Sequence, residues 1–326
     1  MPPPLVTVTS DFGMIDGFVA AMKGVILGIC PDVRLIDISQ YVPPQDVNHA
    51  SFVLGTTFRY FSAPTIHLAV VDPGVGTGRY PILLVTPQGS FIGPDNGIFS
   101  YVLTAYGSTL GEPLPPDVRV LDAVQADVPS TCQAYILDRS EYWAKAVSDT
   151  FHGRDIFAPV AGHLANGVLA EGLGSPISSL KMLYLPSPKV NSGQLEGCVI
   201  HVDRFGNLIT NLVLEDPIDV SAHVEINGDR ITGISGNYQR GNGLLAIIGS
   251  HGFLEIAYVN DNASEHTGAA VGTKVTVSVG GASADLSVVE MTSSLDGIKG
   301  LVSTKQGPIP LELSLVGRHN FENALV

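Results

Sequence analysis

The chain has 326 residues, of which 45% are apolar, and it carries a formal net charge of −14 at neutral pH. This length accommodates two domains that each have a core, and the apolar content excludes a disordered chain. The acidic balance, without a basic stripe, argues against a nucleic-acid partner because nothing would neutralise the phosphates.

Cysteine usage and the amino terminus bear on the cellular compartment. Cys30, Cys132 and Cys198 are odd in number and widely spaced, which is typical of reduced thiols rather than of a disulfide framework or a zinc site. The first residues lack the basic and apolar segments of a signal peptide, and no apolar run reaches membrane-spanning length. We therefore expect a soluble cytoplasmic protein without membrane contact.

Strand-like apolar runs alternate with helical patterns in the first half of the chain. The expected strands cover residues 5–9, 33–38, 66–71, 82–86 and 90–92, and the expected helices cover 17–30, 47–58 and 156–165. This rhythm predicts a Rossmann-like α/β sheet domain at residues 1–185, which we expect to carry the catalytic residues. Residues 104–140 show little periodicity, and we interpret them as an excursion of loops and short elements.

The sequence pattern changes from alternating strands and helices to strands alone after a proline-containing linker at residues 185–193 (LPSPKVNSG). The expected strands that follow cover residues 196–202, 208–212, 223–226, 244–248, 253–259 and 274–279, separated by Asn-Gly and Gly-Ser turns. Short strands with such turns predict a small antiparallel β-barrel or sandwich, which we place at residues 195–280 and expect to complete the substrate site. Residues 281–326 contain β-forming pieces but stay unassigned.

The most informative stretch is residues 70–79 (VVDPGVGTGR), where an apolar strand ends in an acid, turns through glycines and presents a guanidinium. Asp72 is thereby delivered to the carboxyl end of the sheet, and the glycines allow the backbone to approach a ligand closely. A second cluster, residues 151–155 (FHGRD), adds His152 beside a glycine. For either segment alone, a tight turn with a surface salt bridge is the structural alternative. His163 fits a helix position better than a ligand.

Two acids follow the first expected strand. Asp11 lies at its carboxyl end and Asp16 lies five positions beyond, before a helix. An aspartate at this edge of an α/β sheet commonly accepts hydrogen bonds from ribose hydroxyls, and Asp16 is suited to pair with an ammonium group. The alternative is that Asp11 caps the helix. For residues 93–97 (GPDNG) we favour a turn-building role over a ligand role.

The second half contributes an acid, an aromatic face and an amide in one turn. Asp203, Phe205 and Asn207 together are suited to hold an ammonium, stack on a base and contact its edge, although a hairpin turn explains the same letters. Ser250 and Glu255 lie on a later turn and the strand after it. No dinucleotide fingerprint, phosphate-binding loop, nucleophile elbow or metal-spaced His pair is present, so a cofactor-free and metal-free reaction is expected.

Five ordered motifs make the chain resemble the S-adenosyl-L-methionine (SAM) hydroxide adenosyltransferases, adenosine-forming SAM hydrolases related to fluorinase and chlorinase. They are residues 9–13 (TSDFG), 71–79 (VDPGVGTGR), 93–97 (GPDNG), 151–159 (FHGRDIFAP) and 203–211 (DRFGNLITN). The resemblance covers residues 5–279. It implies hydrolysis of SAM, as substrate rather than cofactor, to adenosine and L-methionine by attack of water or hydroxide at C5′. It also implies a homotrimer with active sites at the subunit interfaces.

The resemblance assigns roles to individual positions. A reacting set is implied for Asp72, Arg79 and His152, with the choice of base between Asp72 and His152 left open. Substrate-binding roles are implied for Asp11, Asp16, Asp203, Phe205, Asn207, Ser250, Glu255 and Tyr258. The halogenating relatives carry other residues at His152 and Gly153, so water is the expected nucleophile. The alternatives are a non-catalytic SAM- or adenosine-binding protein and a SAM-dependent halogenase.

Overall fold

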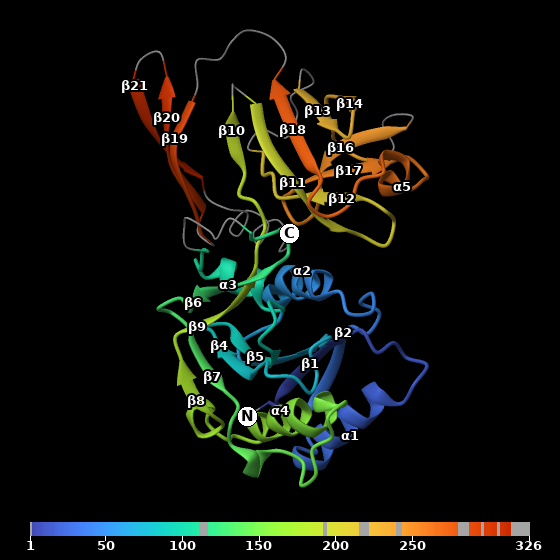
Figure 1. The fold of residues 1–326 in the computed structure, drawn as a ribbon, viewed down its shortest axis with the longest axis vertical. Helices are drawn as coiled ribbons and strands as arrows, with labels where there is room; N and C mark the ends of the chain where they lie inside the picture. The colour runs from blue at the N-terminus through green and yellow to red at the C-terminus, as the bar shows by residue number, and fades with distance from the viewer. Residues whose placement is uncertain are drawn as a thin grey trace. The chain divides into compact units, whose positions relative to one another are not determined.

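The computed structural model describes residues 2–110, 117–191, 194–214, 222–238, 243–279, 287–294, 297–304 and 307–313, and only the backbone of the last three stretches. The chain divides into two compact units, residues 1–184 and residues 185–326 (Figure 1). The first is an α/β sheet unit and the second is built from β-strands. The predicted fold class, an α/β domain followed by a β-barrel domain, is confirmed.

The first unit is organised around a seven-stranded sheet in the order β2-β1-β3-β5-β4-β7-β8. The strands β2, β1, β3 and β5 are parallel, whereas β4, β7 and β8 join by antiparallel pairing. The strands of the unit are β1 (Leu5–Ser10), β2 (Arg34–Ser39), β3 (Thr65–Val70), β4 (Pro81–Val85), β5 (Gly89–Pro94), β6 (Ala123–Asp127), β7 (Gln133–Ile136), β8 (Ser175–Ile177) and β9 (Ser179–Leu183). Its α-helices are α1 (Phe18–Ile29), α2 (Val47–Thr57), α3 (Ser100–Ala105) and α4 (Ala158–Ala165).

Helices cover both faces of this sheet, which explains why its central strand β3 is buried throughout. Successive side chains of a strand point to opposite faces. Leu68 and Val70 of β3 therefore pack with α1 and α4, whereas Ala69 and the following Val71 pack with α2 and α3. A strand buried on both faces reads as a nearly continuous apolar run, as residues 66–71 do apart from His67.

The parallel pairing of β1 and β3 brings two predicted site segments to one sheet edge. Ser10 at the end of β1 pairs with Val70 at the end of β3. Asp11 and Asp72 therefore both follow the carboxyl ends of neighbouring parallel strands, the edge at which α/β sheets bind ligands.

The region interpreted as an excursion, residues 104–140, contributes more than loops. Within its described part, β7 joins the main sheet against β4, and β6 forms a two-stranded ribbon with β9. Both pairings connect residues about fifty positions apart, so no local periodicity announces them.

The second unit is a strongly curved sheet in the order β14-β13-β18-β11-β12-β17-β16-β15, with β10 paired to β11. Strand β14 also contacts β16, which nearly closes the sheet into a barrel, and every pair is antiparallel except β15 with β16. The interior is filled by apolar side chains such as Val199, Val224 and Ile256.

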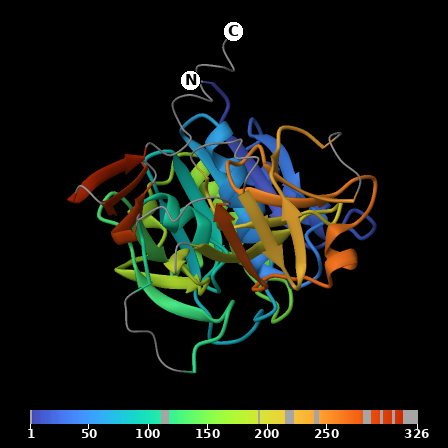
Figure 2. The same ribbon diagram turned by 90° about the horizontal axis from the view of Figure 1, so that it is seen from above.

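The elements of the second unit are β10 (Lys189–Asn191), β11 (Gln194–Val202), β12 (Leu208–Thr210), β13 (Ala222–Ile226), β14 (Asp229–Thr232), β15 (Ile234–Ser235), β16 (Leu244–Ile248), β17 (Leu254–Tyr258), α5 (Ala263–Thr267) and β18 (Lys274–Val279). A separate three-stranded meander follows, with β19 (Ser287–Ser294), β20 (Gly297–Thr304) and β21 (Gly307–Leu313), drawn in red in Figures 1 and 2. Among the described helices, none has the length and apolarity that crossing a bilayer requires.

Candidate active site

Asp72 and Arg79 form a buried ion pair across the glycine-rich turn that follows β3. The Arg79 Nε donates to both carboxylate oxygens of Asp72 at 3.0 Å, and its Nη2 donates to Oδ2 as well. Both side chains are only 7% exposed. A guanidinium held by several bonds to one carboxylate has little freedom to move, so the turn presents its remaining N–H groups in a fixed direction.

His152 completes a contiguous set with this ion pair. The Arg79 Nη2 lies 2.8 Å from His152 Nδ1, and the guanidinium also stacks over the ring of Phe157 at 5.2 Å. The sequence prediction that these three groups act together is thus matched by direct contacts between them, although their roles stay a prediction.

Local backbone structure explains how His152 reaches this position. It directly precedes a π-helical turn (Gly153–Phe157) that leads into α4. Short π-helical segments occur mostly as single turns and frequently at functional sites. Gly153 allows the close fit, because a Cβ there would lie 3.0 Å from the sulfur of Met22 and 3.2 Å from the ring of Phe151.

The environment of His152 keeps its ring neutral. Burial lowers the pKa of His152, and the positive charge of Arg79 lowers it further, while the charges of Asp72, Asp155 and Asp149 oppose the shift. The geometry also assigns a tautomer. A guanidinium has no acceptor, so Nδ1 must accept and the ring proton lies on Nε2.

The two other acids predicted in this unit do not contact the Asp72–Arg79 pair. Asp11 accepts a hydrogen bond at Oδ2 from the backbone N–H of Gln45, at 2.8 Å. Asp16 lies exposed in the turn before α1. A network missed from the sequence supports the β1 end of this edge, since Ser10 donates to Gln40, which in turn donates to Asp37.

In the second unit, Asp203 shapes the turn between β11 and β12. Its Oδ1 accepts from the backbone N–H groups of Phe205 and Asn207 at 2.8 and 2.9 Å, and its Oδ2 accepts from the Asn207 side chain at 2.9 Å. The Phe205 ring is left 76% exposed. The turn-building alternative thus describes Asp203 well, and the turn presents an aromatic face to its surroundings.

Glu255 is buried and contacts two polar side chains, Tyr238 and His251, which the sequence analysis did not select. Tyr238 donates its hydroxyl to Glu255 Oε1 at 2.7 Å, and His251 Nε2 lies 3.6 Å from Oε2. Burial raises the pKa of Glu255, the Tyr238 hydrogen bond lowers it, and the charge of Asp203 raises it. Tyr238 carries no sequence signal, because it lies in the turn after β15 and its partner is seventeen residues away in the chain.

The remaining predicted residues of this unit lie apart from these contacts. Ser250 is exposed in the turn between β16 and β17. Tyr258 lies three positions beyond Glu255, so it points to the opposite face of β17, and its ring contacts that of His266 at 4.5 Å. Within the described ranges, no group of three or more His, Cys, Asp or Glu side chains is arranged to hold a metal ion.

Comparison with known proteins identifies relatives of the whole two-unit arrangement. The family model of the SAM hydroxide adenosyltransferase N-terminal domain matches residues 6–174, and that of the C-terminal domain matches residues 197–276. The (R)-S-adenosyl-L-methionine hydrolase of Salinispora tropica is 35% identical over 86% of this chain and 99% of its own length.

A more distant relative and a solved structure extend the comparison. A fluorinase of an Actinoplanes species is 28% identical over 64% of this chain and 72% of its own length. The crystal structure of a conserved protein from Thermotoga maritima superposes with a TM-score of 0.69 at 29% identity, covering 84% of this chain and 99% of that one.

Proposed function

This chain belongs to the SAM hydroxide adenosyltransferase family, and from that membership we infer that it is an enzyme that hydrolyses SAM to adenosine and L-methionine. The observation that supports a reacting centre is that Asp72, Arg79 and His152 lie in contact. They bring a carboxylate, a guanidinium and a neutral imidazole together. We propose that these three side chains are the catalytic residues.

The proposed reaction is displacement at C5′ of SAM. Water attacks the carbon, the C5′–S bond breaks, and the sulfonium sulfur keeps the bonding electron pair to leave as the neutral thioether of methionine. The leaving group needs no proton, so the site needs no general acid. The one proton to be moved is lost by the attacking water, which becomes the 5′-hydroxyl of adenosine.

Arg79 cannot generate hydroxide before the attack. A unit charge at about 4 Å in an effective dielectric near 20 contributes about 4 kcal/mol, or about 3 pKa units, against a water pKa of about 15.7. The water therefore loses its proton during the attack, to a neighbouring base, while the guanidinium fixes the geometry in a sheltered site.

The hydrogen bonds favour Asp72 over His152 as that base. The Nδ1 lone pair of His152 is occupied by Arg79, and its Nε2 carries the ring proton, so neither nitrogen is free to accept. Asp72 Oδ1 accepts only from Arg79 Nε and retains acceptor capacity. We propose that Asp72 takes the proton and that His152 and Arg79 position the water and the carboxylate.

The substrate-binding roles follow the chemistry that each predicted residue offers. Asp11 Oδ1 is available to a ribose hydroxyl while Oδ2 holds the Gln45 backbone. We propose that Asp16, Asp203 and Ser250 bind the methionine end. Phe205 and Asn207, with the strand carrying Glu255 and Tyr258, enclose the adenine. In this scheme residues 1–185 carry the chemistry and residues 195–280 complete the substrate site.

We further propose that the protein acts in the cytoplasm as a homotrimer in which the sites form at subunit interfaces, and that it requires no cofactor besides its substrate. Support for the assembly comes from the distribution of the proposed site residues over both units. Sedimentation of the purified protein tests the trimer. A monomer with full activity contradicts it.

Product analysis tests the reaction itself. Purified protein is incubated with SAM, with and without chloride or fluoride, and the products are separated by chromatography. We expect adenosine in every case, and none from the matched Arg79→Met variant. A 5′-halogenated nucleoside indicates a halogenase instead, and binding of SAM without turnover indicates a non-catalytic binding protein.

A further inference from the structure

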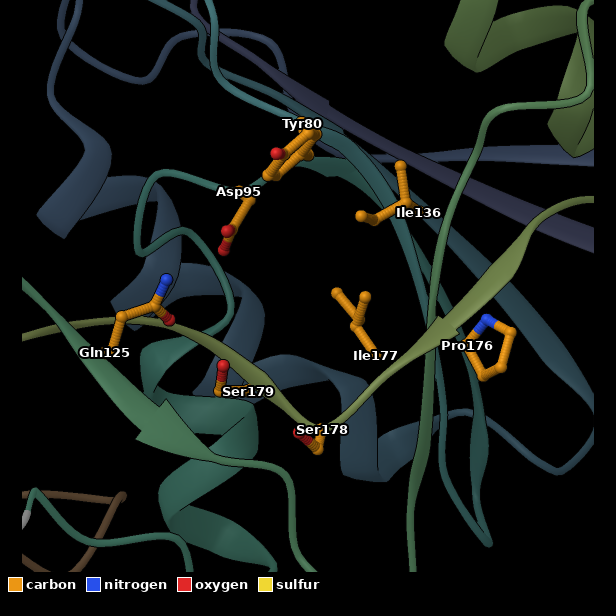
Figure 3. A pocket seen from close by; sticks show the side chains of 8 residues that line it. All are labelled: Tyr80, Asp95, Gln125, Ile136, Pro176, Ile177, Ser178 and Ser179. Atoms are coloured by element: carbon orange, nitrogen blue, oxygen red, sulfur yellow. The ribbon is translucent and has the colours of Figure 1, made fainter.

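A cavity of about 620 Å³ opens on the first unit, and its lining includes Tyr80 but none of Asp72, Arg79 and His152. Its wall is formed by the ends of β5 and β7, by β6 and by the segment that joins β8 to β9. Figure 3 shows the lining side chains facing the open space from several elements. None of the proposed catalytic or substrate-binding residues lines it.

The most buried lining group is the carboxylate of Asp95. The residue is only 5% exposed, yet Figure 3 shows its carboxylate pointing into the cavity. Oδ1 accepts from the backbone N–H of Lys181 at 2.8 Å. Among the described residues, Asp95 forms no ion pair, although the charge of Lys181 acts on it, and the rest of its carboxylate faces the open cavity.

A buried carboxylate in this state favours a positively charged partner. Burial raises the pKa of Asp95, and the Lys181 backbone and charge only partly oppose that shift. The Asp95 carboxylate faces the open cavity, so a cation that enters the cavity can pair with it and stabilise the charged form that burial disfavours.

The rest of the lining divides into a polar and an apolar side. Gln125 and Ser179 lie on the same side of the view as Asp95 and add an amide and a hydroxyl to this side of the lining, whereas Ile136 and Ile177 lie opposite (Figure 3). Acceptors around one carboxylate suit the several N–H donors of an ammonium group. The two isoleucines provide a surface for a short hydrocarbon chain.

We propose that this cavity binds a small aliphatic ammonium ion, whose charge pairs with Asp95 and whose hydrocarbon body lies against Ile136 and Ile177. The site is joined to the reacting turn through the backbone, since the Asp95 N–H donates to the carbonyl of Tyr80, the residue after Arg79, at 2.9 Å. The proposal does not depend on the reaction that the enzyme catalyses.

Ligand-observed NMR titration of the full-length protein tests the proposal, with n-butylammonium as the probe. The controls have the same chain length but a different charge: n-butanol is neutral and butyrate is an anion. We expect saturable binding of n-butylammonium alone, with a Kd of about 1 mM or below. Absence of saturable binding, or equal binding of n-butanol, overturns the proposal without reference to any variant.

Two variants locate the site. Asp95→Asn keeps an oxygen for the Lys181 N–H and removes the charge, and Ile177→Trp fills the cavity while leaving Asp95 in place. Each is expected to weaken n-butylammonium binding at least about tenfold. Asp32→Asn, an exposed acid in the turn after α1, makes the same charge change elsewhere and is expected to leave binding unchanged. Undiminished binding by folded Asp95→Asn protein places the ligand elsewhere and overturns the proposal.

Discussion

Arg79 Nη2 lies 2.8 Å from Nδ1 of His152, a residue 73 positions further along the chain. The Arg79 guanidinium can only donate hydrogen bonds, so the ring nitrogen must accept. This contact decides which atoms of the reacting set are free. It occupies the histidine lone pair that a general base would use and turns Nε2–H toward other partners. The ion pair between Arg79 and Asp72 fixes the donor in place.

The pH dependence of kcat/KM distinguishes the two possible bases. We expect His152→Gln to keep the shape of the acidic limb seen in the wild type, because the ring is already neutral and does not accept the proton. Asp72→Asn is expected to lower kcat by about 10²- to 10⁴-fold, the usual contribution of a positioned base. If the limb near neutral pH disappears in His152→Gln while Asp72→Asn keeps most of its activity, His152 is the base.

The Asp72–Arg79 pair is expected to show strong coupling in stability but not in activity. Arg79→Met leaves a carboxylate with 7% exposure without its cation, which we expect to destabilise the protein by about 3 kcal/mol. Adding Asp72→Asn removes that uncompensated charge, so the double variant should regain most of the stability and remain inactive. Urea unfolding of the four proteins of the cycle measures this, and additive losses contradict the pairing.

His67 is expected to make the first unit sensitive to acid. Its ring lies in the central strand β3, stacks on Phe91 at 4.7 Å and bonds through Nδ1 to the Thr7 hydroxyl at 2.8 Å. Burial lowers the pKa of His67 from 6.5 to about 4. The unfolded chain therefore binds the proton at a higher pH than the folded protein does. Stability is fully present above pH 6.5 and falls by about 3 kcal/mol as the pH drops to 4.

Unfolding followed by the fluorescence of Trp143, the only tryptophan, measures this dependence in the first unit. We expect His67→Phe to be less stable than the wild type at pH 7, because the buried Thr7 hydroxyl loses its partner. The same variant should lose less stability between pH 7 and pH 4.5. An equal loss in both proteins would assign the acid sensitivity to other groups.

Gly206 is expected to be essential to the turn that presents Phe205. Its φ is +82°, and a Cβ there would lie 2.0 Å from the side-chain oxygen of Asn262, which caps α5. Gly206→Ala should therefore destabilise the second unit by about 2 to 3 kcal/mol and raise KM for SAM more than it lowers kcat.

Gly228 provides the matched control for this substitution. It also has a positive φ, +90°, in the turn between β13 and β14, but a Cβ there meets nothing within 4 Å. Gly228→Ala should cost only the backbone strain, about 1 kcal/mol, and leave KM unchanged. Thermal unfolding and steady-state kinetics of both variants decide the matter, and equal effects would mean that the Asn262 contact has no consequence.

Sequence reasoning succeeded where the chemistry is local. The acid at the end of an apolar strand, the glycines after it and Arg79 all lie within ten residues, and their turn forms the ion pair. The Asp203 turn is similar, because its hydrogen bonds span at most four positions. Short-range hydrogen bonds of this kind depend on residue type and spacing, both of which are visible in the chain.

Sequence reasoning failed where a contact joins residues far apart in the chain. The pairing of β7 with β4 and the Tyr238–Glu255 hydrogen bond leave no periodic signal. Asp95 illustrates the same limit, since the sequence favours a turn-building role for residues 93–97 over a ligand role. Its contact with the Lys181 backbone, 86 positions away, places the carboxylate at a cavity.

The amino-acid sequence by itself determined the α/β and β-barrel composition of the protein, the family to which it belongs and the identity of the groups near Asp72, because apolar periodicity, turn residues and motif spacing are local properties. Only the tertiary structure decided how His152 is oriented, which of its nitrogens is occupied and which buried carboxylates, such as Asp95, face a cavity. Those outcomes depend on hydrogen-bond geometry and burial between residues far apart in the chain, which no local pattern encodes.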